Sequence, residues 1–128
     1  MNEKVKYWIE LSDYDLETAE AMLESKRFLY VGYMCHQAIE KIFKAYYCLT
    51  FDEHPPYSHN LSYLSGKTDL NTLISEEFKE FIDILEPLNT EARYPTDKAM
   101  LLKSLTKSKC ESILVKTKKL QVWVKERL

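Results

Sequence analysis

Apolar side chains recur every three or four residues along most of the chain, which is the period of a helix packed on one side. In residues 3–25 this stripe is interrupted by Ser12, and acidic side chains fill the opposite face. Residues 30–51 are apolar around most of the circumference, which predicts a helix at the centre of a bundle. Residues 75–92 repeat the one-sided pattern, and Thr106 is a good N-cap for a last helix.

Polar segments separate these helices. The loop 52–60 contains a Pro-Pro pair that ends the second helix, and either Ser58 or Asn60 can cap the next one. That next helix is short and is expected over residues 61–67, where it ends at a glycine. Residues 98–105 have room for a further short helical turn.

Composition agrees with long helices and few turns. The 128 residues include only two glycines and four prolines, whereas an all-β chain needs many more turn residues. One of these prolines, Pro87, lies inside the pattern of residues 75–92 and should kink that helix or end it early. The sequence therefore predicts an all-α fold, an up-and-down bundle of four main helices plus a short fifth helix, in a single domain spanning residues 1–128.

Charge is distributed unevenly, although the net charge is only −2. Residues 1–97 carry nine basic and 18 acidic side chains, whereas residues 98–128 carry nine basic and two acidic ones. One interpretation is that the basic last helix lies against acidic neighbours. The other is a basic strip that binds phosphates or an acidic partner.

Cysteine and histidine spacing indicates neither disulfides nor a metal site. Cys35 and Cys110 sit in helical apolar patterns and are interpreted as buried reduced thiols, which predicts a cytoplasmic protein. Cys48 with His54 and His59 does not make a recognised zinc spacing, so neither a metal nor a cofactor is expected. No signal peptide is expected from the charged first residues, and no apolar run is long enough to span a membrane.

A polar stripe on the second helix is the first candidate site. His36, Glu40 and Lys44 are spaced four residues apart and therefore share one helical face, with Gln37 alongside. Polar groups on a buried helix must find partners, because burying them unpaired costs stability. The partners are either neighbouring helices, in a purely structural network, or a ligand in a cleft, to which His36 and Lys44 offer hydrogen-bond donors.

Two further places carry candidate binding residues. His59 precedes the short helix, where it either donates to a carbonyl group or lines a site. Arg93 and Tyr94 follow one another where the third long helix ends. An arginine there can clamp a phosphate with two hydrogen bonds, or it can bind the last carbonyl groups of its own helix.

Several short motifs follow one another along the chain. HQAIEKIFKA occupies residues 36–45, SHNL occupies 58–61, EARYP occupies 91–95, and a basic C-terminal helix comes last. In this combination the chain resembles the HEPN domain of small prokaryotic proteins over nearly its whole length. The resemblance implies an up-and-down helical bundle that usually forms a dimer.

The resemblance also implies a function. Many HEPN proteins are encoded beside a minimal nucleotidyltransferase and act as the toxin of a toxin–antitoxin pair. Active members are metal-independent RNases in which an Arg is followed, after four to six residues, by a His, and two protomers pair these motifs. Arg93 matches the Arg and is the catalytic residue if there is one, but no His follows it, since His59 is the last histidine. Proton transfer in such an RNase needs that imidazole or a substitute.

Three functions are therefore open. The leading expectation is a homodimer that lacks the usual RNase motif, binds nucleotide or RNA, and pairs with a nucleotidyltransferase-type protein. The second is an RNase toxin that combines Arg93 with His36 or His59, and the third is a purely structural interaction module. The dimer is expected to use aromatic side chains that one bundle cannot bury. These are Tyr46, Tyr47 and Phe51.

Overall fold

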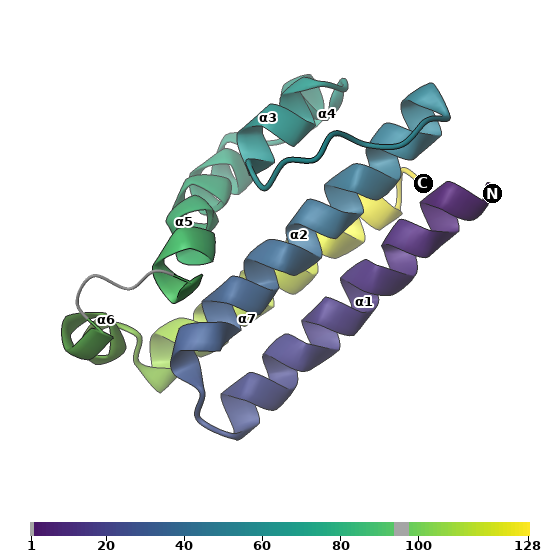
Figure 1. The fold of residues 1–128 in the computed structure, drawn as a ribbon. Coiled ribbons are helices and arrows are strands. Elements are labelled where there is room, and N and C mark those ends of the chain that lie inside the picture. Colours follow the sequence, from purple (N-terminus) through teal and green to yellow (C-terminus); the bar gives the residue numbers. More distant parts are fainter. Residues whose placement is uncertain (1, 94–97) are drawn as a thin grey trace.

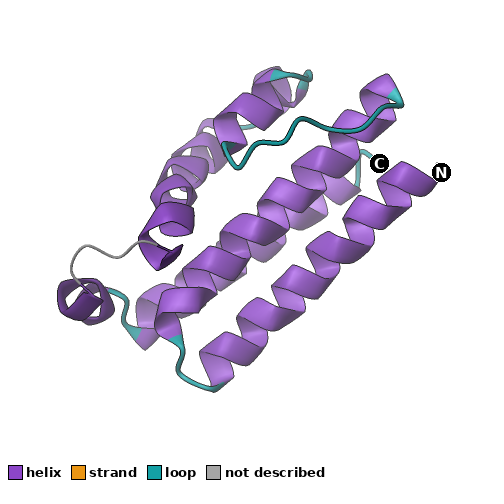
Figure 2. Cartoon of the chain, viewed as in Figure 1, coloured by secondary structure: helices purple, strands orange, loops and turns teal. Residues whose placement is uncertain are grey.

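The structure, a computed structural model, describes residues 2–93 and 98–128, which form helices joined by short connections (Figure 1). The four long helices are α1 (Glu3–Glu24), α2 (Phe28–Phe51), α5 (Glu76–Arg93) and α7 (Lys107–Lys125). The three short ones are α3 (Leu61–Gly66), α4 (Leu70–Leu73) and α6 (Lys98–Ser104). Figure 2 shows helices and loops but no strand in the described residues, so the predicted all-α class is confirmed.

The topology is the predicted up-and-down bundle. α1 and α5 run one way and α2 and α7 run the other way, so that the two termini lie at the same end of the molecule (Figure 1). The short helix expected after the Pro-Pro loop is α3, and the turn expected over residues 98–105 is α6. The sequence did not predict α4, because its four residues are too few to display a helical period.

Helix α2 lies at the centre, as its apolar circumference predicted. It contacts α1, α5 and α7, and more than half of its residues are buried. Its fully buried side chains include Ile39, Ile42 and Phe43, which join Leu85 of α5 and Leu120 of α7 in one core. Burying each such side chain stabilises the fold by about 1.5–3 kcal/mol before the entropy cost. The polar side chains along the middle of this central helix, His36, Glu40 and Lys44, are buried against its neighbours.

Side-chain caps fix the helix starts at the predicted places. The Asn60 side chain accepts a hydrogen bond from the backbone N–H of Tyr63 at 2.8 Å and begins α3. The Thr106 side chain does the same for the N–H of Lys109 at 3.2 Å and begins α7. Asn60 places the residue before it, His59, at the mouth of α3.

Pro87 does not end α5, which continues to Arg93, so the expectation of an early end is wrong. A proline inside a helix costs about 3 kcal/mol, because it removes one backbone hydrogen bond and crowds the preceding turn. Packing on both sides of Pro87 offsets this cost: Leu85 is fully buried just before it, and Ala92 is buried in the last turn.

The Ser12 interruption of the α1 stripe is a buried link between three helices. The Ser12 hydroxyl donates a hydrogen bond to the backbone carbonyl of Ala38 in α2, at 2.7 Å. It also accepts one from the side-chain amide of Gln121 in α7, at 2.9 Å. A serine is therefore compatible with the core here, because both sides of its hydroxyl group are paired.

The basic last helix lies against acidic neighbours, which confirms the first interpretation of the charge pattern. Lys118 of α7 pairs with Glu20 of α1 at 2.8 Å, and Lys125 pairs with Asp13. All three cysteines are buried and free, as expected for reduced thiols. Burial raises the pKa of the Cys35 thiol to about 12. Within the described residues no helix is long and apolar enough to cross a membrane.

Candidate functional site

The polar stripe of α2 is buried along its whole length. His36, Glu40 and Lys44 are all shielded from solvent, and they face the helices and the loop that pack on α2. One oxygen of the Glu40 carboxylate accepts a hydrogen bond from the Lys44 ammonium at 3.1 Å. The same ammonium lies 5.2 Å from the centre of the Trp8 ring of α1. A buried cation is therefore held between a carboxylate and an aromatic face.

His59 completes this end of the stripe. Its Nδ1 lies 2.8 Å from the second oxygen of Glu40, so the two Glu40 oxygens have one partner each. The position of His59 follows from the loop before α3, in which Pro55 is buried and Asn60 caps the helix. The structure thus brings together His36, Glu40, Lys44 and His59 from the predicted candidates, and the Glu40 end matches the structural alternative.

Glu86 of α5 is a member of the site that sequence reasoning missed. Its carboxylate accepts hydrogen bonds from the backbone N–H groups of Leu61 and Ser62, at 2.9 and 3.4 Å. One of its oxygens lies 3.6 Å from Nε2 of His36, beyond hydrogen-bond distance. The signal was present in the sequence: Glu86 follows the buried Ile82 by four residues, so an acid stands on the apolar stripe of its helix.

His36 lies between two acceptors and has one proton to offer. Its Nδ1 is 3.3 Å from the side-chain oxygen of Gln37, while its Nε2 is buried without any hydrogen-bond partner. Burial lowers the pKa of His36 below its ordinary value, against the opposing effects of Glu40, Gln37 and Glu86. The neutral ring carries a single N–H, and cannot donate to both Gln37 and Glu86. This part of the site is therefore short of donors.

Asn89 extends the unpaired region along α5. Its side-chain oxygen is buried and has no hydrogen-bond partner, and it follows Glu86 by three residues on the same helical face. His36 Nε2 and Asn89 Oδ1 are the buried side-chain atoms without a partner among the residues described. Buried polar atoms are nearly always paired in folded proteins, so an unpaired imidazole nitrogen on α2 and an unpaired amide oxygen on α5 mark this place.

Comparison with protein-family models identifies the chain. The HEPN domain family model matches residues 5–127, which is nearly the whole sequence. The chain belongs to the HEPN domain family.

The structural comparison agrees with this HEPN fold. The crystal structure of TT1696 from Thermus thermophilus superimposes with a TM-score of 0.83 at 18% sequence identity. The match covers 99% of this chain and 100% of that one. At this identity the likeness concerns the fold alone. A comparison with curated proteins found no significant match.

Arg93, which matches the Arg of the HEPN motif, stands apart from the α2 cluster. It is the last residue of α5 and its side chain is exposed. Because it follows Glu86 by seven residues, it lies about 10 Å further along the helix than the carboxylate that approaches His36. His59 is at the opposite end of the cluster, beside Glu40. Tyr94, the remaining candidate, lies outside the described residues.

The arrangement offers mainly hydrogen-bond acceptors. In residues 2–93 and 98–128 no group of three or more potential metal ligands comes together. What the site offers is a neutral imidazole, a carboxylate and an amide oxygen, all of which accept hydrogen bonds. A molecule with several N–H or O–H donors, such as a sugar or a base amine, has the complementary chemistry.

Proposed function

We propose that this HEPN domain works as a homodimer that binds nucleotide or RNA, as the partner of a nucleotidyltransferase in a toxin–antitoxin-type pair. It acts without the Arg–His RNase motif, because no histidine follows Arg93 in the chain. The observation that carries the proposal is the pair of buried polar atoms on α2 and α5, His36 Nε2 and Asn89 Oδ1, that have no hydrogen-bond partner among the described residues. Ribose hydroxyls and base amino groups supply the missing donors.

Exposed aromatic side chains support the dimer. Phe51 at the end of α2 is 47% exposed and packs at a tilt against the Tyr47 ring, with ring centres 4.7 Å apart. Tyr46 is different from the expectation, since it is buried and its hydroxyl group donates to Asp69 in the connection before α4. The patch offered to a second protomer is therefore centred on Tyr47 and Phe51, whereas Tyr46 belongs to the core.

Binding is the first test. A nucleotide that binds the folded state at about 100 times its Kd adds about 2.7 kcal/mol to the free energy of unfolding, which a thermal shift detects. We expect such a shift with adenosine nucleotides or with short single-stranded RNA. The variant Asn89→Leu should reduce the shift, and Thr90→Ala, on the exposed side of the same helix, should keep it in full. No shift with any of these ligands contradicts the proposed binding.

Two further measurements separate the alternatives. Sedimentation at tens of micromolar should give a dimer, and a monomer would contradict the homodimer. Incubation with varied RNAs in the presence of a chelator should leave the RNA intact. Cleavage by the wild type that Arg93→Ala abolishes would overturn the non-catalytic proposal in favour of the RNase.

A further inference from the structure

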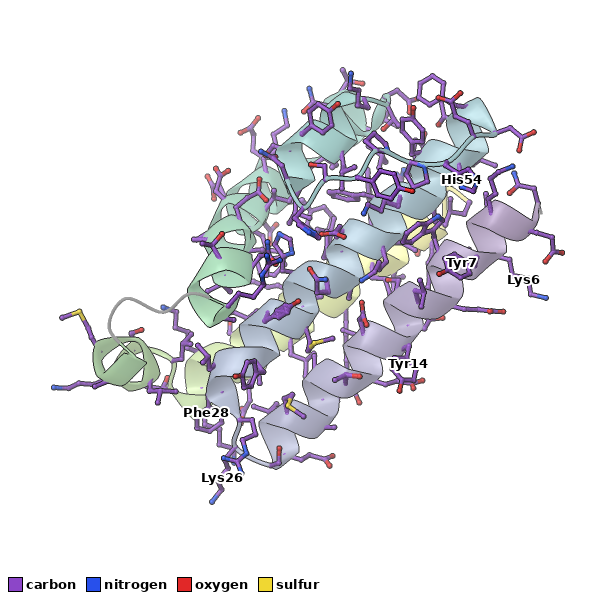
Figure 3. The ribbon with its side chains drawn as sticks, viewed as in Figure 1. Lys6, Tyr7, Tyr14, Lys26, Phe28 and His54 are labelled. Carbon is purple, nitrogen blue, oxygen red and sulfur yellow. The ribbon has the colours of Figure 1, made fainter. Side chains whose placement is uncertain are left out.

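A cleft away from the His36 site opens between the first two turns of α1 and the loop that leads into α3. Its volume is about 520 Å³, within the usual range of small-molecule sites. It is lined by Glu3, Lys4, Tyr7, Trp8, His54 and Tyr57. Figure 3 shows Tyr7 on α1 and His54 on the loop close together at this end of the molecule.

Three aromatic rings form the walls. Tyr57 is fully exposed, at 106% of the reference area, and Tyr7 is 56% exposed. Trp8 meets the Tyr7 ring edge to face, with ring centres 5.2 Å apart. A ring without contacts of its own gains free energy by stacking on another flat apolar surface. The exposed faces of Tyr7 and Tyr57 therefore suit a planar aromatic group.

The loop that carries Tyr57 is held at several points, although Tyr57 itself touches little. The Tyr47 hydroxyl donates to Glu53 at 2.8 Å, Pro55 is buried, and His59 contacts Glu40 at 2.8 Å. A wall fixed in this way loses little conformational entropy when a ligand binds. The loop that forms this wall is therefore held in place before any ligand arrives.

Positive charge borders the same cleft. Lys4 is only loosely paired with the exposed Asp52, at 3.7 Å, and such exposed pairs contribute little. The N-terminus of α1 begins here and carries the positive end of the helix dipole. His54 adds a ring N–H donor, and Glu3 is the acidic residue of the lining. The cleft therefore suits a ligand that places an anionic group next to Lys4 and a flat ring next to Tyr7.

We propose that this cleft binds the base of a nucleotide, with the ring against Tyr7 and Tyr57 and the phosphate toward Lys4 and the N-terminus of α1. The inference rests on the proposed binding of nucleotide or RNA and says where a base stacks. It concerns a place distinct from His36: Trp8 lies over Lys44, about 12 Å further along α2 than His36. The base belongs either to a free mononucleotide or to a single-stranded RNA.

Tryptophan fluorescence tests the proposal, since the chain has only two tryptophans. The variant Trp123→Phe leaves Trp8 as the reporter inside the cleft. Stacking of a base should quench its emission when adenosine monophosphate or a short single-stranded RNA is added. Quenching by the mononucleotide identifies the free nucleotide as a source, and quenching by RNA alone identifies the strand. The reverse variant, Trp8→Phe, retains Trp123, which is not part of the cleft lining, and should show no quenching.

Substitutions in this background locate the contact. Tyr7→Ala and Tyr57→Ala should each raise the Kd about fivefold or more, as expected for loss of one base–aromatic stack. Tyr14→Ala is the matched control, because Tyr14 is an exposed tyrosine two turns further along α1 (Figure 3). It should leave the Kd unchanged. Lys6→Ala is the corresponding control for Lys4→Ala, which should weaken binding.

The outcomes separate this inference from the proposed function. If RNA or nucleotide binds and Asn89→Leu weakens it, but Tyr7→Ala and Tyr57→Ala do not, the inference is overturned and the proposed function stands. If nothing binds to the chain, both fail. If Tyr57→Ala changes the sedimentation coefficient and leaves nucleotide affinity alone, the cleft is a contact between protein chains and the inference is overturned.

Discussion

The two ends of the polar stripe on α2 differ in how completely their polar atoms are paired. At one end both oxygens of Glu40 have partners, from Lys44 and His59. At the other end His36 Nε2 and Asn89 Oδ1 have none. Both ends are buried in the same bundle, between the same central helix and its neighbours, so burial alone does not explain the difference.

The comparison separates a fully paired network from a place with unpaired polar atoms. A buried network in which every polar atom is paired needs no ligand to explain it, because it makes the core rigid and specific. An unpaired buried acceptor costs about 1–3 kcal/mol relative to a paired one. The end near His36 is not explained in this way, and the proposed nucleotide or RNA would bring the missing donors. Three substitutions test this difference between the ends.

The largest effect is expected at the paired end. Glu40→Ala leaves the Lys44 ammonium buried without a counter-charge and should lower the free energy of unfolding by about 3 kcal/mol or more. Urea denaturation measures the change. The control is Glu111→Ala, which breaks the exposed pair with Lys107 at 3.8 Å and should have no measurable effect. Equal effects of the two variants would remove the distinction between this network and a surface pair.

A smaller effect of opposite sign is expected at the unpaired end. Asn89→Leu removes an orphaned oxygen and keeps the number of side-chain heavy atoms, so the free energy of unfolding should stay the same or rise by about 1 kcal/mol. Gln121→Leu is the matched change at a buried amide that is paired, with Ser12 and Asp13. It should destabilise the protein. A destabilised Asn89→Leu variant would mean that this oxygen is satisfied in solution and that the two ends are alike.

The smallest effect concerns pH. Burial lowers the pKa of His36 in the folded chain below its value of 6.5 when exposed. Between these two pKa values the unfolded chain binds the extra proton, so His36 contributes stability above pH 6.5 that is lost as the pH falls below it. Denaturation at several pH values should show a shallower loss for His36→Asn than for the wild type. An equal slope for His36→Asn and the wild type would refute the assignment.

The fold was predictable because its signals are local. Helical periodicity, the capping residues Asn60 and Thr106, and the apolar circumference of α2 are all readable within one or two turns. The pairing of Glu40 with Lys44 was predictable for the same reason, since it joins two residues of one helix. Pro87 was the exception, because the packing that carries α5 past it comes from other helices.

The rest depends on which helix faces which. Glu86 and Asn89 stand on a stripe that sequence reasoning treated as core, and only the packing of α5 on α2 brings Glu86 near His36 and buries the Asn89 oxygen. The separation of Arg93 from His59 likewise follows from the direction of α5. The aromatic cleft joins Tyr7 and Tyr57, fifty residues apart in the sequence, and no local pattern connects them.

The hydroxyl group of Ser12 has a consequence for the alignment of the helices along their axes. Apolar contacts tolerate sliding, because one methyl group replaces another. If α1 slid by one turn, about 5.4 Å, the bonds of Ser12 to Ala38 and Gln121 would break together inside the core. The two hydrogen bonds of Ser12 thereby fix the axial register of α1 against α2 and α7. Trp8 lies one turn from Ser12 on α1, so the same register places its ring over Lys44. The position of the aromatic cleft therefore depends on the hydrogen bonds of a buried serine.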